Sequence, residues 1–234
     1  MIAALIVLLT VLSYAIAWVL AVPILVPFLN TAVSFPFMID ALRQGRIRVA
    51  IARMLVWAAT LGVCAMLLSY ARPQETGELF LHGAAYRVEM FTWVMTGQGA
   101  ESRPSQFIPL HARDTAIFAG LAIGTAGALA MPMGAALMNY MGHYVGTLAL
   151  HSARPALTMV LGWHPWSVIR IVSFVAIGTI LALPLLARLL SFPVDWREPR
   201  RLLLWAGGGL IADVILKSLL APFWQRLLLH TVGW

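Results

Sequence analysis

Long apolar runs, separated by shorter polar stretches, follow one another along most of the chain. A helix that crosses a bilayer needs about 20 consecutive apolar residues, and these runs reach that length. The run 115–150 is too long for one crossing and just long enough for two short ones. At its centre, Met131-Pro132-Met133-Gly134 contains helix breakers that favour a turn. The sequence therefore predicts an all-α polytopic helical bundle, a single membrane domain over 1–234. Its six predicted transmembrane helices are about 1–22, 51–70, 115–131, 134–150, 165–187 and 202–220.

The arginines orient these spans. Short loops rich in Lys and Arg lie on the cytoplasmic side of a membrane. Segments 43–53 and 188–201 hold four arginines each, so both are predicted inside and an even number of spans must separate them. A hairpin within 115–150 satisfies this condition. The amino terminus and the polar stretch 72–113 are then predicted outside. A kinked, re-entrant first segment, which leaves five spans, is the alternative.

Composition supports this class. The chain is 61% hydrophobic and 11% charged, whereas soluble domains are about 45–50% apolar and about 25% charged. A soluble enzyme, a disordered tail and a coiled coil are therefore excluded. The net charge of +7 is explained by the inside loops, and no nucleic-acid partner is predicted. We expect a multi-pass protein of a bacterial-type inner (plasma) membrane. The single cysteine, Cys64, can form neither an internal disulfide nor a zinc site.

The outer stretch 72–113 contains one patterned segment. Residues 84–96 predict a short amphipathic helix, which could lie flat in the membrane interface or cover the outer end of the bundle. Its apolar face consists of Tyr86, Met90, Trp93 and Val94. The stretch also holds potential ligands, namely His82, Glu89, Glu101 and His111. None of them has the helical spacing of a convincing ligand pair, so no metal site is predicted.

The last span carries two ionisable residues, Asp213 and Lys217, which are costly inside a membrane and therefore informative. Their i, i+4 spacing, with the acid first, predicts an ion pair on one helix face that pins a neighbouring helix. The alternatives are a carboxylate that exchanges protons or binds a cation, and a lysine that extends to the outer surface. We expect Arg170 to extend outward in the same way.

The fourth span carries a second polar group. Asn139 and His143 share a helix face, and Tyr140 and Tyr144 form a neighbouring stripe. The favoured interpretation is a hydrogen-bonded histidine between helices. The alternative is a haem or chlorophyll-type pigment on His143, with nearby glycines leaving room for a flat ring. We predict no cofactor.

Small residues at helical spacing let helices approach closely within the bundle, or let this chain bind other membrane subunits. They form three motifs: Gly120-x-x-x-Gly124, Gly142-x-x-x-Gly146 and Gly207-Gly208-Gly209.

The function favoured by these patterns is that of a non-catalytic subunit or scaffold of a larger membrane assembly, in energy transduction or transport. One alternative is a small-solute or ion transporter component that uses Asp213 and Lys217. Another is a haem- or pigment-binding redox protein that uses His143. A membrane-embedded enzyme with its site at His82, Glu89 and His111 ranks last, because no nucleophile–base pair or carboxylate pair can be identified. No catalytic residues are predicted.

Overall fold

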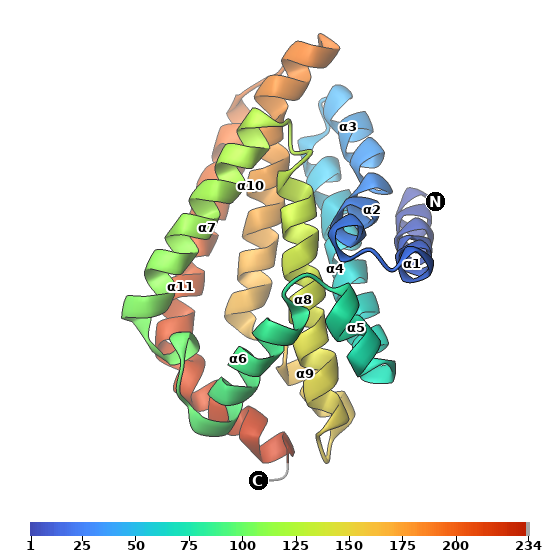
Figure 1. Cartoon of the computed structure of the whole chain (residues 1–234). Helices are drawn as coiled ribbons and strands as arrows, with labels where there is room; N and C mark the ends of the chain where they lie inside the picture. Colours follow the sequence, from blue (N-terminus) through green and yellow to red (C-terminus); the bar gives the residue numbers. More distant parts are fainter. Residues whose placement is uncertain (233–234) are drawn as a thin grey trace.

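The computed structural model describes residues 1–232, which are almost entirely helical and contain no strand (Figure 1). This confirms the all-α class. The α-helices are α1 (Ile2–Leu20), α2 (Val26–Ala32), α3 (Phe35–Arg43), α4 (Ile47–Ala71), α5 (Pro73–Leu79), α6 (Gly83–Thr96), α7 (Pro104–Gly124), α8 (Ala130–Leu150), α9 (Pro155–Leu161), α10 (Pro165–Leu190) and α11 (Arg197–Val232). Two short 3-10 helices, η1 (Pro23–Leu25) and η2 (Ala100–Ser102), complete them.

Within the described residues, five helical segments are long and apolar enough to cross a membrane, by length and composition. They are Ile2–Leu20, Pro23–Arg43, Ile47–Ala71, Pro165–Leu190 and Arg197–Val232. Four of them overlap predicted spans, whereas Pro23–Arg43 was not predicted and the predicted spans 115–131 and 134–150 are not among the five. The predicted count of six is therefore not confirmed. The prolines of Pro23–Arg43 stand in the first turns of η1, α2 and α3. A helix tolerates proline there because those N–H groups have no partner within the helix.

The run 115–150 folds back on itself as predicted, but the predicted turn position is wrong. The turn occupies residues 125–129, where Ala126 and Gly127 have φ angles of 53° and 84°. Met131-Pro132-Met133-Gly134 instead belongs to the first turns of α8, where Pro132 costs no hydrogen bond. Helix α7 also begins earlier than predicted, at Pro104, so its first half comes from the polar stretch 72–113.

The two arginine-rich segments lie at the same end of the bundle, as the loop-charge rule requires. Arg48 at the start of α4 forms an ion pair with Glu198 at the start of α11. The turn between α7 and α8 lies at this end too, close to α3 and α10 (top of Figure 1). Helices α5, α6 and α9 cover the opposite end.

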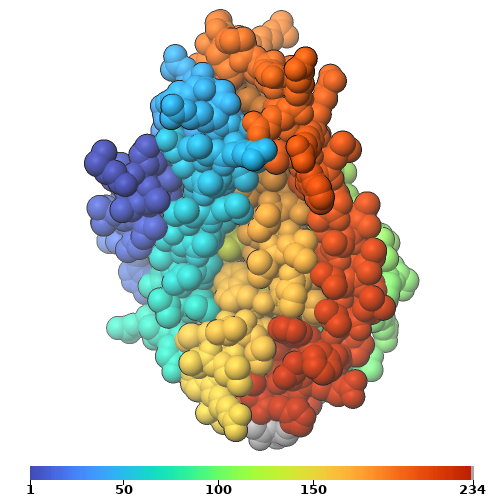
Figure 2. Space-filling view, turned by 180° about the vertical axis from the view of Figure 1, so that it is seen from behind, coloured from blue at the N-terminus to red at the C-terminus, as the bar shows by residue number. Residues whose placement is uncertain are grey.

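The helices of the bundle are held together by two main interfaces, α4 with α8 and α10 with α11. In the space-filling view, α10 lies at the surface between α4 and α11 (Figure 2). Gly142 and Gly146 explain the closeness of α4 and α8. A Cβ on Gly142 would lie 2.6 Å from the Cβ of Ala65, and a Cβ on Gly146 would lie 2.9 Å from the backbone N of Tyr70.

The other glycine motifs behave differently. Cβ atoms on Gly120 and Gly124 of α7 would meet nothing within 4 Å among the described residues, and the same holds for Gly207 and Gly208. Gly209 packs against Ser173 of α10. Spacing alone therefore does not tell a glycine at a helix–helix contact from one that faces away from the bundle.

Candidate functional site

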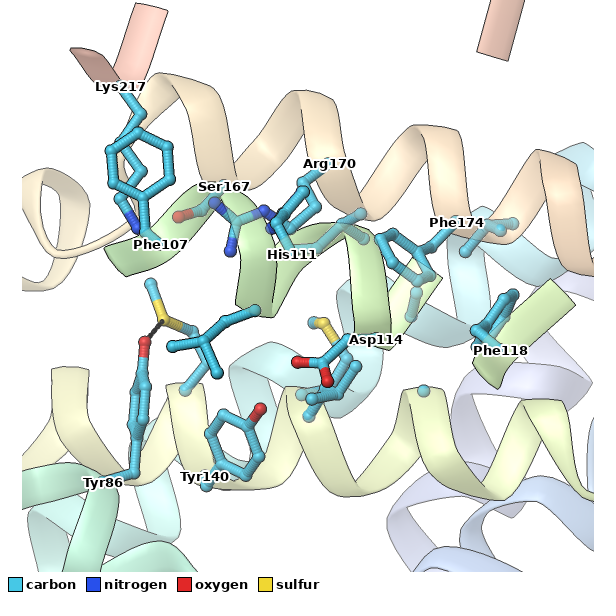
Figure 3. A pocket seen from close by; sticks show the side chains of 18 of the residues that line it. Tyr86, Phe107, His111, Asp114, Phe118, Tyr140, Ser167, Arg170, Phe174 and Lys217 are labelled. Carbon is cyan, nitrogen blue, oxygen red and sulfur yellow. Dashed lines mark hydrogen bonds between the residues drawn. The ribbon is translucent and has the colours of Figure 1, made fainter. Parts of the chain in front are cut away.

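A cavity of about 410 Å³ separates α7 from α8 (Figure 3). It forms because α7 packs mainly on α10 while α8 packs on α4, so that α7 and α8 meet at few points. Helix α10 forms another wall, and α4 lies behind. At the end distant from the arginine-rich segments, the cavity is bordered by α6, η2 and α11.

The two ends of the cavity differ in chemistry. The half towards the turn between α7 and α8 is apolar and is lined by Trp57, Phe118, Met131, Met138, Phe174 and Val175. The other half is polar and is lined by Tyr86, Glu89, Glu101, His111, Arg113, Asp114, Tyr140, Ser167, Arg170 and Lys217. Figure 3 shows the same gradient, from Lys217, Tyr86 and Ser167 at one end to Phe118 and Phe174 at the other.

Asp213 of α11 does not line the cavity itself but contacts two residues that do, His111 and Arg170. Its two carboxylate oxygens accept hydrogen bonds from Nε and Nη2 of Arg170, each at 3.0 Å. Nε2 of His111 lies 2.7 Å from Oδ2. The Asp213 side chain is only 1% exposed, whereas that of Arg170 is 28% exposed and lines the cavity. Arg170 therefore does not extend outward, contrary to the sequence prediction, because a buried carboxylate binds it in a two-bond geometry.

Lys217 forms the second buried ion pair. Its Nζ lies 2.6 Å from Oε1 of Glu101 and 4.4 Å from the centre of the Phe107 ring. The predicted pair between Asp213 and Lys217 is therefore wrong. The two side chains share a helix face, but each reaches a carboxylate or cation on another element. Arg170, Asp213 and Lys217 carry two positive charges and one negative charge between them. This excess of one positive charge could have indicated from the sequence that an acidic residue of the stretch 72–113 pairs with them.

Two outer carboxyl groups have shifted pKa values. Burial alone would raise the pKa of Glu101, but the positive charges of Lys217 and Arg170 outweigh burial and lower it. Glu101 therefore stays ionised. The pKa of Glu89 is raised, first by partial burial and second by the negative charge of Glu101. Glu89 consequently binds a proton more readily than a solvated glutamate.

Asn139 does not line the cavity and belongs to a separate polar network. Its Nδ2 donates to Oδ1 of Asn30 at 3.0 Å, and Tyr14 donates to its Oδ1. Trp57 donates from Nε1 to the backbone oxygen of Asn30 at 2.8 Å. All these groups are buried, so the network joins α1, α2, α4 and α8 by satisfied hydrogen bonds.

His143 is buried between helices, with Nδ1 3.1 Å from Oγ of Ser69 and 3.2 Å from Oγ1 of Thr76. Helix α5 packs against its other nitrogen, since a Cβ on Gly77 would lie 3.5 Å from Nε2. A flat cofactor on Nε2 would have to displace α5. This geometry favours the interhelical histidine over the pigment ligand.

The remaining predicted residues do not converge on one point. Tyr140 lines the cavity, whereas Tyr144 is buried beside His164. His82 is exposed, and Trp93 donates to Oγ of Ser102. No group of three potential metal ligands occurs in the described part of the chain. Helix α6 lies where a short helix was predicted, and its buried residues Met90, Trp93 and Val94 pack at the end of the bundle distant from the arginine-rich segments.

No protein-family model matches the chain, and neither a curated protein nor a solved structure shows significant similarity to it.

Proposed function

We propose that this chain is a multi-pass membrane protein that binds a small solute in the cavity between α7 and α8, as a component of a transport system. The observation that carries the proposal is the placement of two buried ion pairs, Arg170–Asp213 and Lys217–Glu101, at one end of that cavity. Ionisable groups on apolar helices are costly and typically mark solute pathways. A volume of about 410 Å³ is within the range of small-molecule sites.

The outward surface of the bundle supports the membrane setting. Leu204, Ile211 and Leu219 of α11 are 79%, 65% and 70% exposed, as lipid-facing side chains are. Asp213 follows Arg197 by 16 residues of helix, which corresponds to about 24 Å at about 1.5 Å per residue. In a hydrocarbon core of about 30 Å, with the arginine-rich end inside, the ion pairs lie in the outer half. The cavity then receives solute from the outer side of an inner (plasma) membrane.

The same orientation changes the expected position of the amino terminus. Two segments of spanning length, rather than one, precede Arg43. If both cross, the amino terminus lies inside, opposite to the sequence prediction.

Thiol labelling tests the site. The chain has one cysteine, so a Cys64→Ser background allows single cysteines to be placed at will. Ser167→Cys lines the cavity, whereas Val172→Cys, on the same helix, has a 44% exposed side chain outside the cavity lining. A charged, membrane-impermeant thiol reagent added to intact cells should label position 167 and not position 172. An unreactive position 167 in folded protein would refute a solute site open to the outer side.

Transport itself is tested in proteoliposomes. The wild-type chain should accumulate at least one solute from a panel of amino acids, quaternary amines and small phosphate esters. Gly134→Leu, which projects a side chain from α8 into the cavity, should abolish that uptake. Gly120→Leu is the matched control, because a Cβ there meets nothing within 4 Å.

A scaffold or subunit role is the second candidate. The outward-facing glycines Gly120 and Gly124 favour it, because they would let a helix of another subunit approach α7 closely. A partner that co-purifies with the wild-type chain and is lost with Gly120→Leu, in the absence of any solute uptake, would favour this role.

A further inference from the structure

The cavity has the polarity of an amphiphile. Its apolar half lies towards the middle of the bundle, between Phe118 of α7, Met138 of α8 and Phe174 of α10. Its charged half lies towards the outer end, beside α6, η2 and Lys217 of α11. A purely polar solute would leave the apolar half without a complementary surface. A hydrocarbon chain would fill that half and bury its own apolar surface at the same time.

The charges of the polar half are paired except at one carboxylate. Three carboxylates line it, Glu89, Glu101 and Asp114, and Asp213, outside the lining, binds Arg170. Against these four stand three cations, Arg113, Arg170 and Lys217, so that among the described residues only Glu89 is left without a cation partner. Every cation already has a carboxylate partner within 3.0 Å. An anionic ligand would therefore meet a carboxylate beside each cation that it approached. A head group that carries both charges can place its cation at Glu89 and its anion at Arg170 without adding net charge to the site.

The side chains that line the polar half form two subsites on opposite walls. On one side the rings of Tyr86 and Tyr140 have centres 4.5 Å apart, and Glu89 follows Tyr86 by one helical turn. These two rings pack on each other, and the parts of them that line the cavity would attract a quaternary ammonium group together with the Glu89 carboxylate. On the opposite wall Ser167 and Arg170 of α10 offer a hydroxyl and a partly exposed guanidinium, which suit a phosphate (Figure 3).

Building on the proposed function, we infer that the solute is a single-chain zwitterionic amphiphile of the lysophosphatidylcholine type. It is recognised by two facing groups, Tyr86–Tyr140–Glu89 on one wall and Arg170 with Ser167 on the other, which adjoin the apolar half of the cavity. The ammonium binds at the tyrosines, the phosphate binds at Arg170, and the chain extends towards Phe118. The volume of about 410 Å³ is near the lower end for ligand sites, so the cavity accommodates one chain rather than two.

Photo-cross-linking in lipid nanodiscs tests this assignment. The probe is lysophosphatidylcholine with a diazirine near the end of its chain, and the modified residues are identified by mass spectrometry. Phe118 and Met138 are only 2% and 7% exposed, so they are modified only if the chain enters the cavity. We expect modification of both in the wild type and in Gly120→Leu, and its loss in Gly134→Leu.

Folding of Gly134→Leu is verified by its unfolding transition, and Gly134→Ala provides a milder variant. A Cβ at 134 lies 3.7 Å from the Phe118 ring, an ordinary contact, so this variant should fold and show intermediate labelling. For the head group, Glu89→Gln with Tyr86→Ala should weaken labelling about tenfold. A lysophosphatidylglycerol probe of equal chain length should also label at least about tenfold less than the zwitterion, because its uncompensated charge remains buried.

The outcomes separate this inference from the proposed function. Labelling confined to outward residues such as Ile117 and Leu219 would show that no chain enters, and would overturn the inference. So would glycerophosphocholine competing as well as the lysolipid, or equal labelling by the anionic probe. If position 167 still reacts with the polar thiol reagent in those cases, the cavity binds a solute of another class and the proposed function stands. An unreactive position 167 would refute the proposed function itself.

Discussion

The partner of Asp213 can be determined by a double-mutant cycle. Sequence spacing pairs Asp213 with Lys217, whereas the structure pairs it with Arg170 through two hydrogen bonds of 3.0 Å. Removing one partner of a buried ion pair costs about 3–5 kcal/mol, because the other charge is left without compensation. Arg170 is 28% exposed towards the cavity, so some solvation of its charge reduces this cost. We expect Asp213→Asn to lower the free energy of unfolding by about 2–4 kcal/mol.

The assay is reversible unfolding in mixed detergent micelles, with tryptophan fluorescence as the readout. Asp213→Asn, Arg170→Met and the double variant form one cycle, and Lys217→Met replaces Arg170→Met in the second. The first cycle should give a coupling free energy of about 2–3 kcal/mol and the second less than about 0.5 kcal/mol. A larger coupling in the second cycle would refute the pairing, and with it the description of the polar half of the cavity.

Three further predictions use the same preparation. Gly146→Ala should destabilise the protein by about 1–3 kcal/mol, because its Cβ overlaps the α4 backbone, whereas Gly120→Ala should be neutral or stabilise by up to about 1 kcal/mol. Burial lowers the pKa of His164 to about 3. As the pH falls, His164 is therefore protonated in the unfolded state before it is protonated in the folded state. The free energy of unfolding should fall by about 1–2 kcal/mol as the pH is lowered from about 7.5 to 5, and it should fall less in His164→Gln. Cysteines placed at positions 48 and 195 should react with an impermeant reagent from the same side of the membrane, because Arg48 pairs with Glu198.

Several elements of the fold could be predicted from local patterns or from the distribution of arginines along the chain. The amphipathic pattern over 84–96 agrees with α6 at Gly83–Thr96, and its apolar face is buried except for the partly exposed Tyr86. The return of the 115–150 run follows from charge parity between the two arginine-rich segments. The turn itself was misplaced because Pro132 is acceptable in the first turns of a helix. The conformation of Ala126 and Gly127 left no comparable mark in the sequence.

The site could be predicted only in part. Asp213 and Lys217 could be singled out as costly charges, because that cost depends only on their apolar surroundings along the helix, and both are buried in the structure. Their partners could not be identified, because these come from residues 101, 111 and 170 on three other elements. The cavity depends on how far α7 stands from α8, and helix spacing of this kind is set by packing rather than by any one residue.

Asp213 and Lys217 also connect α11 to residues from the polar stretch 72–113, because Glu101 of η2 is bound to Lys217 and His111 of α7 is in contact with Asp213. The groups that hold the outer segments in place are therefore the same groups that line or support the polar half of the cavity. Substituting any of them should reduce stability and ligand labelling together, so a loss of binding in Asp213→Asn cannot separate recognition from folding. Gly134 takes part in no such pair, and its substitution fills space in the apolar half. Loss of labelling in Gly134→Leu with an unchanged free energy of unfolding would therefore locate the ligand in the cavity, independently of the stability of the bundle.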